Sequence, residues 1–135
     1  MMTVKRLAAT ANVTPETVRY YVRTGLLRPV RDPINGYRRF SMADVNRLRF
    51  ISLAKSLGFT LAEITKVLAD AEVGESPCPR VRSIIRQRIG ENRKHIDELL
   101  ALQSRMELAE RQWQGMDDGM PGGNSICRLI ETMNA

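Results

Sequence analysis

Two cysteines carry the most reactive side chains of this chain of 135 residues. Cys78 lies between Pro77 and Pro79, so a helix that begins at Pro79 would place Cys78 at its N-cap. Cys127 falls in the first turn of a short helix that we expect over residues 126–133. The positive end of a helix dipole favours the thiolate form of a cysteine. Thiolates bind soft and borderline metal ions and react with oxidants and electrophiles, so the pattern favours a metal site or a thiol sensor.

A long helix must position the first of these thiols. The residues from Pro77 to about Trp113 contain no proline after Pro79, and apolar side chains recur along them with alternating steps of three and four residues. That 3.5-residue period is typical of a coiled-coil seam. The seam consists of Ile85, Ile89, Asn92, Ile96, Leu99, Gln103 and Met106. Because no other long apolar helix occurs to receive this face, we expect a homodimer; packing of the helix within its own domain is the alternative.

The charge distribution points to a polyanion partner. Residues 1–58 hold 11 Lys and Arg against 3 Asp and Glu, whereas residues 59–135 hold 10 against 12. No run of eighteen apolar residues suggests a membrane span, and no signal peptide is apparent, so we expect a cytoplasmic protein with reduced thiols. With one histidine and no phosphate-binding glycine loop, the sequence does not indicate an enzyme.

The basic half predicts a helix-turn-helix. Two short helices are expected over Thr3–Ala11 and Pro15–Arg23, with Thr14 as the N-cap of the second and Gly25 after its end. The second helix would enter the major groove of DNA with its N-terminal end. The candidate DNA contacts on this helix are Thr14, Thr17, Arg19, Tyr20, Tyr21 and Arg23, although one tyrosine ring could instead pack in the core.

A small β-wing is expected next. Asn35-Gly36 favours a two-residue type I′ hairpin in which both residues have positive φ. Tyr37, Arg38 and Arg39 at its tip would contact the DNA backbone. Capping boxes at Ser41 and Thr60 begin two further helices, and residues 69–76 are expected to form a linker to the long helix.

These segments together resemble the MerR family of bacterial transcription regulators. The motifs that carry the resemblance are Val13-Thr14-Pro15-Glu16-Thr17-Val18-Arg19-Tyr20-Tyr21, Gly25-Leu26-Leu27, Asn35-Gly36-Tyr37-Arg38 and Leu57-Gly58-Phe59-Thr60-Leu61-Ala62-Glu63-Ile64. The resemblance implies a homodimer held by an antiparallel coiled coil and bound to double-stranded promoter DNA. It also implies activation by bending and untwisting a promoter whose spacer is too long for RNA polymerase.

The cysteines resemble those of the metal-sensing branch of that family. Cys78 matches the ligand at the start of the long helix, and Cys127 matches the last ligand of the following loop. The first cysteine is typical of sensors for the divalent ions of zinc, cadmium, lead or mercury. The usual middle cysteine has no counterpart, so Asp117 or Asp118, a methionine sulfur or a water would have to complete the coordination shell.

The expected architecture is therefore mostly α-helical. It comprises a winged helix-turn-helix domain with linking helices over residues 1–75, a dimerisation helix over 76–115, and a metal-binding loop with a short helix over 116–135. A thiol-based redox or electrophile sensor using Cys78 remains an alternative. A winged-helix architectural DNA-binding protein is a second alternative, and two inert buried cysteines would be a purely structural outcome.

Overall fold

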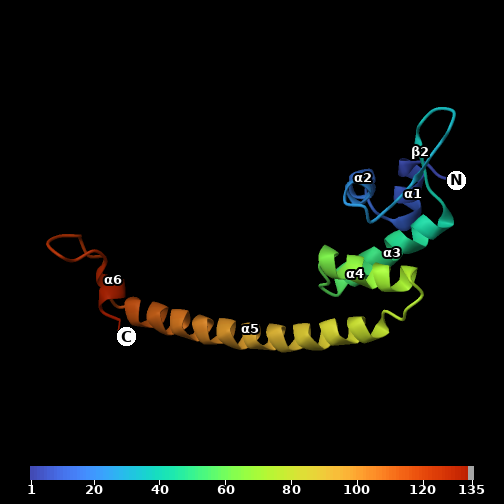
Figure 1. The fold of residues 1–135 in the computed structure, drawn as a ribbon. Coiled ribbons are helices and arrows are strands. Elements are labelled where there is room, and N and C mark those ends of the chain that lie inside the picture. The colour runs from blue at the N-terminus through green and yellow to red at the C-terminus, as the bar shows by residue number, and fades with distance from the viewer. Residues whose placement is uncertain (134–135) are drawn as a thin grey trace. The chain divides into compact units, whose positions relative to one another are not determined.

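The computed structural model describes residues 1–133 and divides the chain into two compact units, Met1–Ile84 and the part that begins at Ile85. Figure 1 shows the order of the elements along the chain. They are α1 (Val4–Ala11), α2 (Pro15–Arg23), β1 (Val30–Arg31), β2 (Arg38–Arg39), α3 (Met42–Ser56), α4 (Leu61–Glu72), α5 (Cys78–Trp113) and α6 (Arg128–Glu131). The prediction of a mostly helical chain with a helix-turn-helix, a wing and one long helix is confirmed.

The helix-turn-helix forms where its capping residues predict it. The hydroxyl oxygen of Thr14 accepts the Thr17 N–H at 3.1 Å, and Pro15 occupies the first position of α2. Before that, Asn12 adopts a left-handed conformation with φ of 57°, which ends α1. Thr24 is the C-cap of α2, and Gly25 follows with φ of 82°. Local backbone chemistry therefore accounts for the end of α1 and the start of α2, as the sequence predicts.

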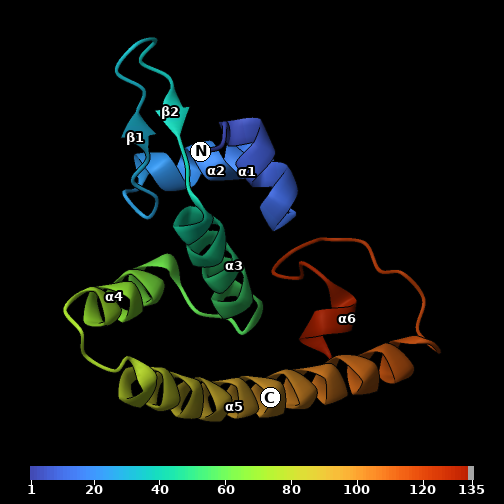
Figure 2. The same ribbon diagram turned by 90° about the vertical axis from the view of Figure 1, so that its right-hand side faces the viewer.

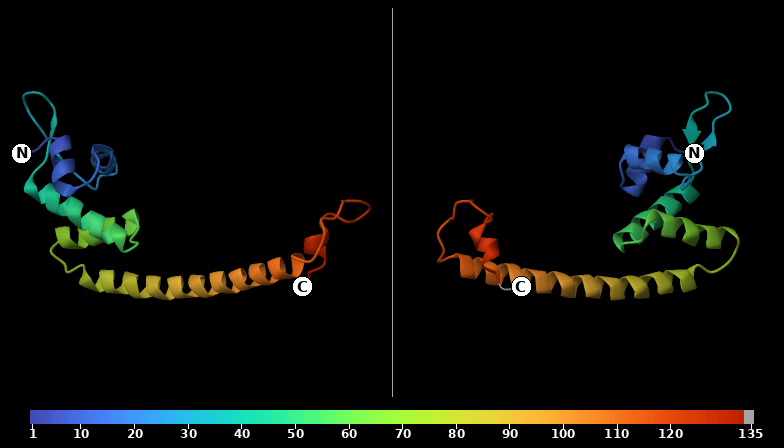
Figure 3. Two further views of the ribbon diagram at one scale, coloured as in Figure 1. Left: turned by 180° about the vertical axis from the view of Figure 1, so that it is seen from behind. Right: turned by 60° about the vertical axis from the view of Figure 1, so that its left-hand side comes forward.

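The wing is an antiparallel pair in which Val30 is opposite Arg39 and Arg31 is opposite Arg38. The prediction of a two-residue type I′ turn is wrong, because Gly36 has a positive φ of 71° but Asn35 does not. Residues 33–36 form a longer loop, closed by the Gly36 N–H donating to the Asp32 carbonyl at 2.9 Å. The Asp32 carboxylate also accepts the Ile34 N–H at 2.8 Å, so the chain turns before it reaches Asn35. Figure 3 shows from two sides that this loop projects away from helices α1 to α3.

Helix α4 extends further than the sequence suggested. The expected linker over residues 69–76 is wrong for its first four residues, which are helical up to Glu72. Two of those four are alanines, the best helix formers, and the first residue that strongly opposes a helix is Gly74, with φ of 78°. At the other end, Thr60 and Glu63 form the expected capping box.

The hydrophobic core lies in the unit Met1–Ile84 and joins the helix-turn-helix to α3 and α4. Phe40, which follows the wing, is fully buried, and its backbone exchanges two hydrogen bonds with Met2, at 2.6 and 2.9 Å. The other buried apolar residues of this unit are Leu7, Ala8, Ala11, Val18, Tyr21, Leu26, Leu27, Val45, Leu48, Ile51, Ala54, Phe59, Ile64 and Val67. This core holds α2 and the base of the wing in fixed positions relative to each other.

Helix α5 is one uninterrupted helix of 36 residues, and within the described chain Ala109 is its only buried residue. The predicted seam is left uncovered: Ile89, Ile96, Leu99 and Met106 are 64, 47, 66 and 56% exposed. Helix α6 lies beside the C-terminal end of α5 (Figure 2) and is shorter than the expected 126–133. Among the described residues, no helix has the length and apolar character that crossing a membrane requires.

Candidate functional site

The N-terminal end of α2 presents two hydroxyls. The Thr14 and Thr17 hydroxyl oxygens lie 2.9 Å apart, and Thr14 also caps the helix. Thr14 is exposed and Thr17 is half-buried. The Thr14 hydroxyl therefore caps the helix and is also accessible. The N-terminal end of a recognition helix is the end that meets base edges in the major groove.

The next turn of α2 separates the two predicted tyrosine contacts. Tyr20 is 42% exposed and lies under the guanidinium of Arg23, whose central carbon is 5.8 Å from the ring centroid. Tyr21 is only 4% exposed, so its ring belongs to the core, which is the alternative that the sequence left open for one of the two tyrosines. Arg19 is exposed on the same helix. The exposed residues of α2 after Glu16 are therefore two arginines and one aromatic ring.

A groove of about 760 Å³ runs between the start of α1, the exposed side of α2 and the wing. Its lining includes Arg19 and Arg38, which the sequence predicted, and Lys5 and Arg31, which it did not. The Arg31 guanidinium also donates to the Gly36 carbonyl at 3.4 Å. Four cations around one groove attract a phosphate backbone. The expected hairpin could have indicated Arg31, because Arg31 lies opposite Arg38 in it, whereas no sequence signal indicates Lys5.

Hydrogen bonds and an ion pair stiffen the tip of the wing. The pKa of Asp32 is lowered, mainly because its carboxylate accepts the Ile34 backbone N–H, and further because Arg39 lies 3.5 Å away. Tyr37 is 70% exposed beyond this arrangement, and Arg38 is half-buried in the groove. The wing thus presents an aromatic hydroxyl on a firmly shaped loop.

Cys78 is exposed and is the first residue of α5, not the N-cap that the sequence suggested. The helix begins one residue earlier because the Ser76 hydroxyl accepts the Cys78 N–H at 3.3 Å, while the Pro77 carbonyl accepts the Val81 N–H at 3.0 Å. Two residues further on, Arg80 donates two hydrogen bonds to Asp70, at 2.8 and 3.3 Å. The Cys78 thiol therefore lies at the positive end of the α5 dipole, in a first turn that the Arg80–Asp70 hydrogen bonds hold to α4.

Cys127 is half-buried and is the N-cap of α6, where the sequence suggested the first turn. The Glu131 carboxylate accepts hydrogen bonds from the Ser125 hydroxyl at 2.9 Å and from the Ile126 N–H at 3.0 Å, and so orders the two residues before Cys127. The indole N–H of Trp113 donates to the Leu129 carbonyl at 2.8 Å and holds α6 against the end of α5. The second thiol is therefore also held at a helix start.

The proposed carboxylate ligands are free to coordinate. Asp117 and Asp118 are exposed, and neither makes a hydrogen bond or an ion pair with other described residues. Within the part of the chain that the structure describes, no three His, Cys, Asp or Glu side chains lie together as a metal-binding group. The 36 residues of α5 separate the two cysteines by about 54 Å of helix. A metal site that both cysteines share would therefore draw on a second chain.

The chain is similar to known proteins over most of its length. Residues 2–71 match the model of MerR HTH family regulatory proteins, and residues 45–109 match the model for the MerR DNA-binding region. A mercuric resistance operon regulatory protein from Bacillus cereus is 33% identical over 129 residues, which cover 94% of this chain and 92% of the relative.

Two solved structures extend the likeness over nearly the whole chain. The transcription regulator PbrR691 from Ralstonia metallidurans CH34, solved with lead(II), covers 97% of this chain and 98% of its own, with a TM-score of 0.76 and 24% identity, and shows the fold. The regulator MerR from Bacillus megaterium MB1, solved with mercury(II), covers 98% of both chains at 28% identity, with a TM-score of 0.61.

Proposed function

The chain belongs to the MerR family of helix-turn-helix regulatory proteins, and from that membership we propose that it is a dimeric, metal-responsive transcription regulator. It binds promoter DNA in the bacterial cytoplasm and activates RNA polymerase by distorting that DNA. The observation that carries the proposal is the pair of thiols at two helix starts, joined by one long helix whose apolar seam is uncovered.

DNA binding is assigned to the outward side of α2 and to the wing. Arg19, Lys5, Arg31 and Arg38 surround the groove and neutralise phosphates, while Thr14, Thr17, Tyr20, Arg23 and Tyr37 contact the DNA beside them. Tyr21 supports this surface from the core. In a dimer each copy would contact one half of a two-fold symmetric operator.

The seam supports a dimer, and the family resemblance implies that its two helices are antiparallel. Burying a leucine or isoleucine stabilises by roughly 1.5–3 kcal/mol, so four exposed apolar side chains in one row strongly favour pairing with a second copy. In an antiparallel pair the start of one α5 lies beside the end of the other. Cys78 would then meet Cys127 of the partner subunit, and Asp117 or Asp118 of the partner subunit would supply the remaining donors.

The donor set fits a divalent ion of zinc, cadmium, lead or mercury. Two thiolates suit soft and borderline metals, and carboxylate oxygens complete a shell that lacks a third cysteine. Bound metal would need to favour the dimer state that distorts DNA, because an effector shifts an equilibrium only by its differential affinity. Bending and untwisting a promoter costs on the order of a few kcal/mol, which groove contacts must offset.

Metal titration of mixed dimers tests this proposal. Cys78→Ser and Cys127→Ser chains are each expected to lose tight binding of zinc, cadmium, lead or mercury by the reduced protein. A mixed dimer of the two variants pairs the intact Cys78 of one chain with the intact Cys127 of the other, so it should regain one site per dimer.

Failure of the mixture to regain binding would contradict a site shared between chains. Binding that survives Cys127→Ser would overturn the assignment of Cys127. The wild-type protein could instead bind none of the four ions and activate transcription in response to peroxide in a way that depends on Cys78. That result would favour the thiol sensor.

A further inference from the structure

The last turn of α4 carries two acidic residues that bind different partners. Asp70 accepts two hydrogen bonds from Arg80 of α5, at 2.8 and 3.3 Å. Glu72 lies 3.1 Å from the Arg47 guanidinium of α3. Residues two apart on a helix point to different sides. The end of α4 is therefore held from one side by α5 and from another by α3.

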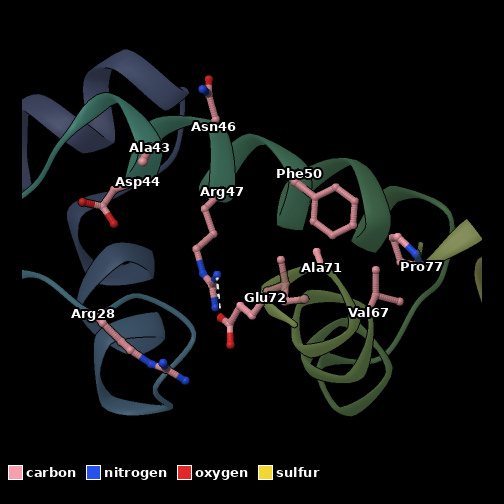
Figure 4. A pocket seen from close by; sticks show the side chains of 11 residues that line it. Arg28, Ala43, Asp44, Asn46, Arg47, Phe50, Val67, Ala71, Glu72 and Pro77 are labelled. Atoms are coloured by element: carbon pink, nitrogen blue, oxygen red, sulfur yellow. Dashed lines mark ion pairs between the residues drawn. The ribbon is translucent and has the colours of Figure 1, made fainter. Parts of the chain in front are cut away.

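Arg47 continues this arrangement to the recognition helix. Figure 4 shows its side chain reaching from α3 to Glu72. Its Nε also donates to the Leu26 carbonyl at 2.6 Å. Leu26 is buried three residues after the end of α2, and the next amide, Leu27 N–H, donates to the Tyr21 carbonyl at 3.1 Å. One guanidinium thus joins α4 to the peptide that closes α2.

Helices α3 and α4 are separated on one side by an open pocket, so their packing there is incomplete. A pocket of about 510 Å³ is lined by residues of both helices, among them Phe50, Val67, Leu68 and Ala71 (Figure 4). Where packing is incomplete, polar contacts have a larger share in setting the position of a helix. The two ion pairs are such contacts, and both lie within the unit Met1–Ile84.

We propose that Arg80, Asp70, Glu72 and Arg47 form a mechanical connection from the first turn of α5, which holds Cys78, to the end of α2. We call these four residues the α4 connection. A displacement of the first turn of α5 would move α4 through Asp70, and Glu72 would pass that movement to Arg47 and the Leu26–Leu27 peptide. The regulatory use of the connection rests on the proposed function, because metal at Cys78 would supply the displacement. The four residues are positioning residues and need not contact metal or DNA.

Amide hydrogen exchange at Leu27 tests the connection without metal, in the full-length protein. Arg80→Gln removes the first link, and we expect Leu27 to exchange roughly threefold faster or more, as for residues coupled in one network. The Val13 amide, which donates to the Ala8 carbonyl at 3.0 Å at the end of α1, is the internal reference and should not change. Arg82→Gln is the matched variant, because Arg82 lies near the same end of α5 and its side chain makes no hydrogen bond or ion pair with described residues.

Two further variants separate a connection from a general loss of stability. In a Glu72→Gln background, Arg80→Gln should add nothing at Leu27, because the path is already broken. Exchanging the charges, Asp70→Arg with Arg80→Asp, should restore slow exchange. Leu27 exchange that ignores Arg80→Gln, or that rises equally at Val13 or in Arg82→Gln, would overturn the proposal.

The same variants distinguish this proposal from the proposed function. If the wild type responds to metal but Leu27 ignores Arg80→Gln, the connection is wrong and the sensor assignment stands. If Leu27 responds as expected but no metal alters transcription by the wild type, the connection stands as a feature of the fold and the sensor assignment fails.

Discussion

The indole nitrogen of Trp113 lies 2.8 Å from the Leu129 carbonyl oxygen and joins the last residue of α5 to the helix that Cys127 begins. Trp113→Phe keeps an aromatic ring but removes the donor, a loss of about 1 kcal/mol. Because α6 would lose its fixed position, we expect metal affinity to fall about fivefold. Operator affinity of the metal-free protein should stay unchanged. Isothermal titration with metal and a DNA-binding assay measure the two quantities, and equal loss in both would contradict a local role for Trp113.

The two cations that the sequence did not predict should contribute to DNA binding. Lys5→Gln and Arg31→Gln each remove one charge from the groove, so each should weaken operator binding and reduce the slope of log affinity against log salt by about 0.9. Lys66→Gln, with the same charge change on exposed α4 surface, should leave the slope unaltered. Binding measured over a series of salt concentrations provides the slopes. Indistinguishable slopes for all three variants would exclude the groove as the phosphate-binding surface.

The uncovered seam should decide the oligomeric state. Leu99 is 66% exposed in the single chain, and Leu99→Ser would place a hydroxyl in the centre of the proposed dimer interface. We expect this variant to sediment as a monomer at micromolar concentration, or to show a dimer dissociation constant raised at least tenfold. Ala101→Ser lies two residues away, on a different side of the helix, and should remain dimeric. A wild-type monomer would contradict the dimer outright.

The Asp70–Arg80 pair should be visible in the acid titration of the protein. The pKa of Asp70 is lowered from its ordinary value because its carboxylate accepts hydrogen bonds from the Arg80 guanidinium. A lowered folded-state pKa contributes stability that is present above the unfolded pKa and is lost as the pH falls through the folded one. Carboxyl carbon NMR should therefore show Asp70 titrating below ordinary aspartates, and Arg80→Gln should shift its pKa upward. Asp32 should not respond to that substitution, since its own pKa is lowered chiefly by the Ile34 N–H.

The sequence predicted well those features that depend on neighbouring residues. The Thr60–Glu63 capping box formed because its donors and acceptors lie within one turn. The prediction of a linker from residue 69 was wrong because the helix propensity of Ala69 and Ala71 outweighs the polar residues beside them. The prediction of a type I′ turn at the wing tip was wrong because the Asp32 carboxylate and Pro33 turn the chain before Asn35 does.

Features that depend on tertiary contact were largely inaccessible to sequence analysis. Nothing in the local sequence distinguishes the buried ring of Tyr21 from the exposed ring of Tyr20; the core residues around α2 make that choice. Lys5 and Arg31 lie 26 positions apart and line one groove because Met2 pairs with Phe40, which follows the wing. The sequence likewise does not distinguish Arg47 from the other basic residues of α3, although its guanidinium links α3 to Glu72 of α4 and to the Leu26 carbonyl.

The backbone pairing of Met2 with Phe40 has a practical consequence for anyone who modifies this protein. The first residues are hydrogen-bonded to the chain just after the wing, and Thr3, Val4 and Lys5 line the groove. An affinity tag or fluorescent fusion placed ahead of Met1 would emerge at the rim of that groove and compete with bound nucleic acid. A histidine-rich tag would also chelate the metals used in titrations. A cleavage site that allows the tag to be removed before DNA-binding and metal-binding measurements avoids both effects.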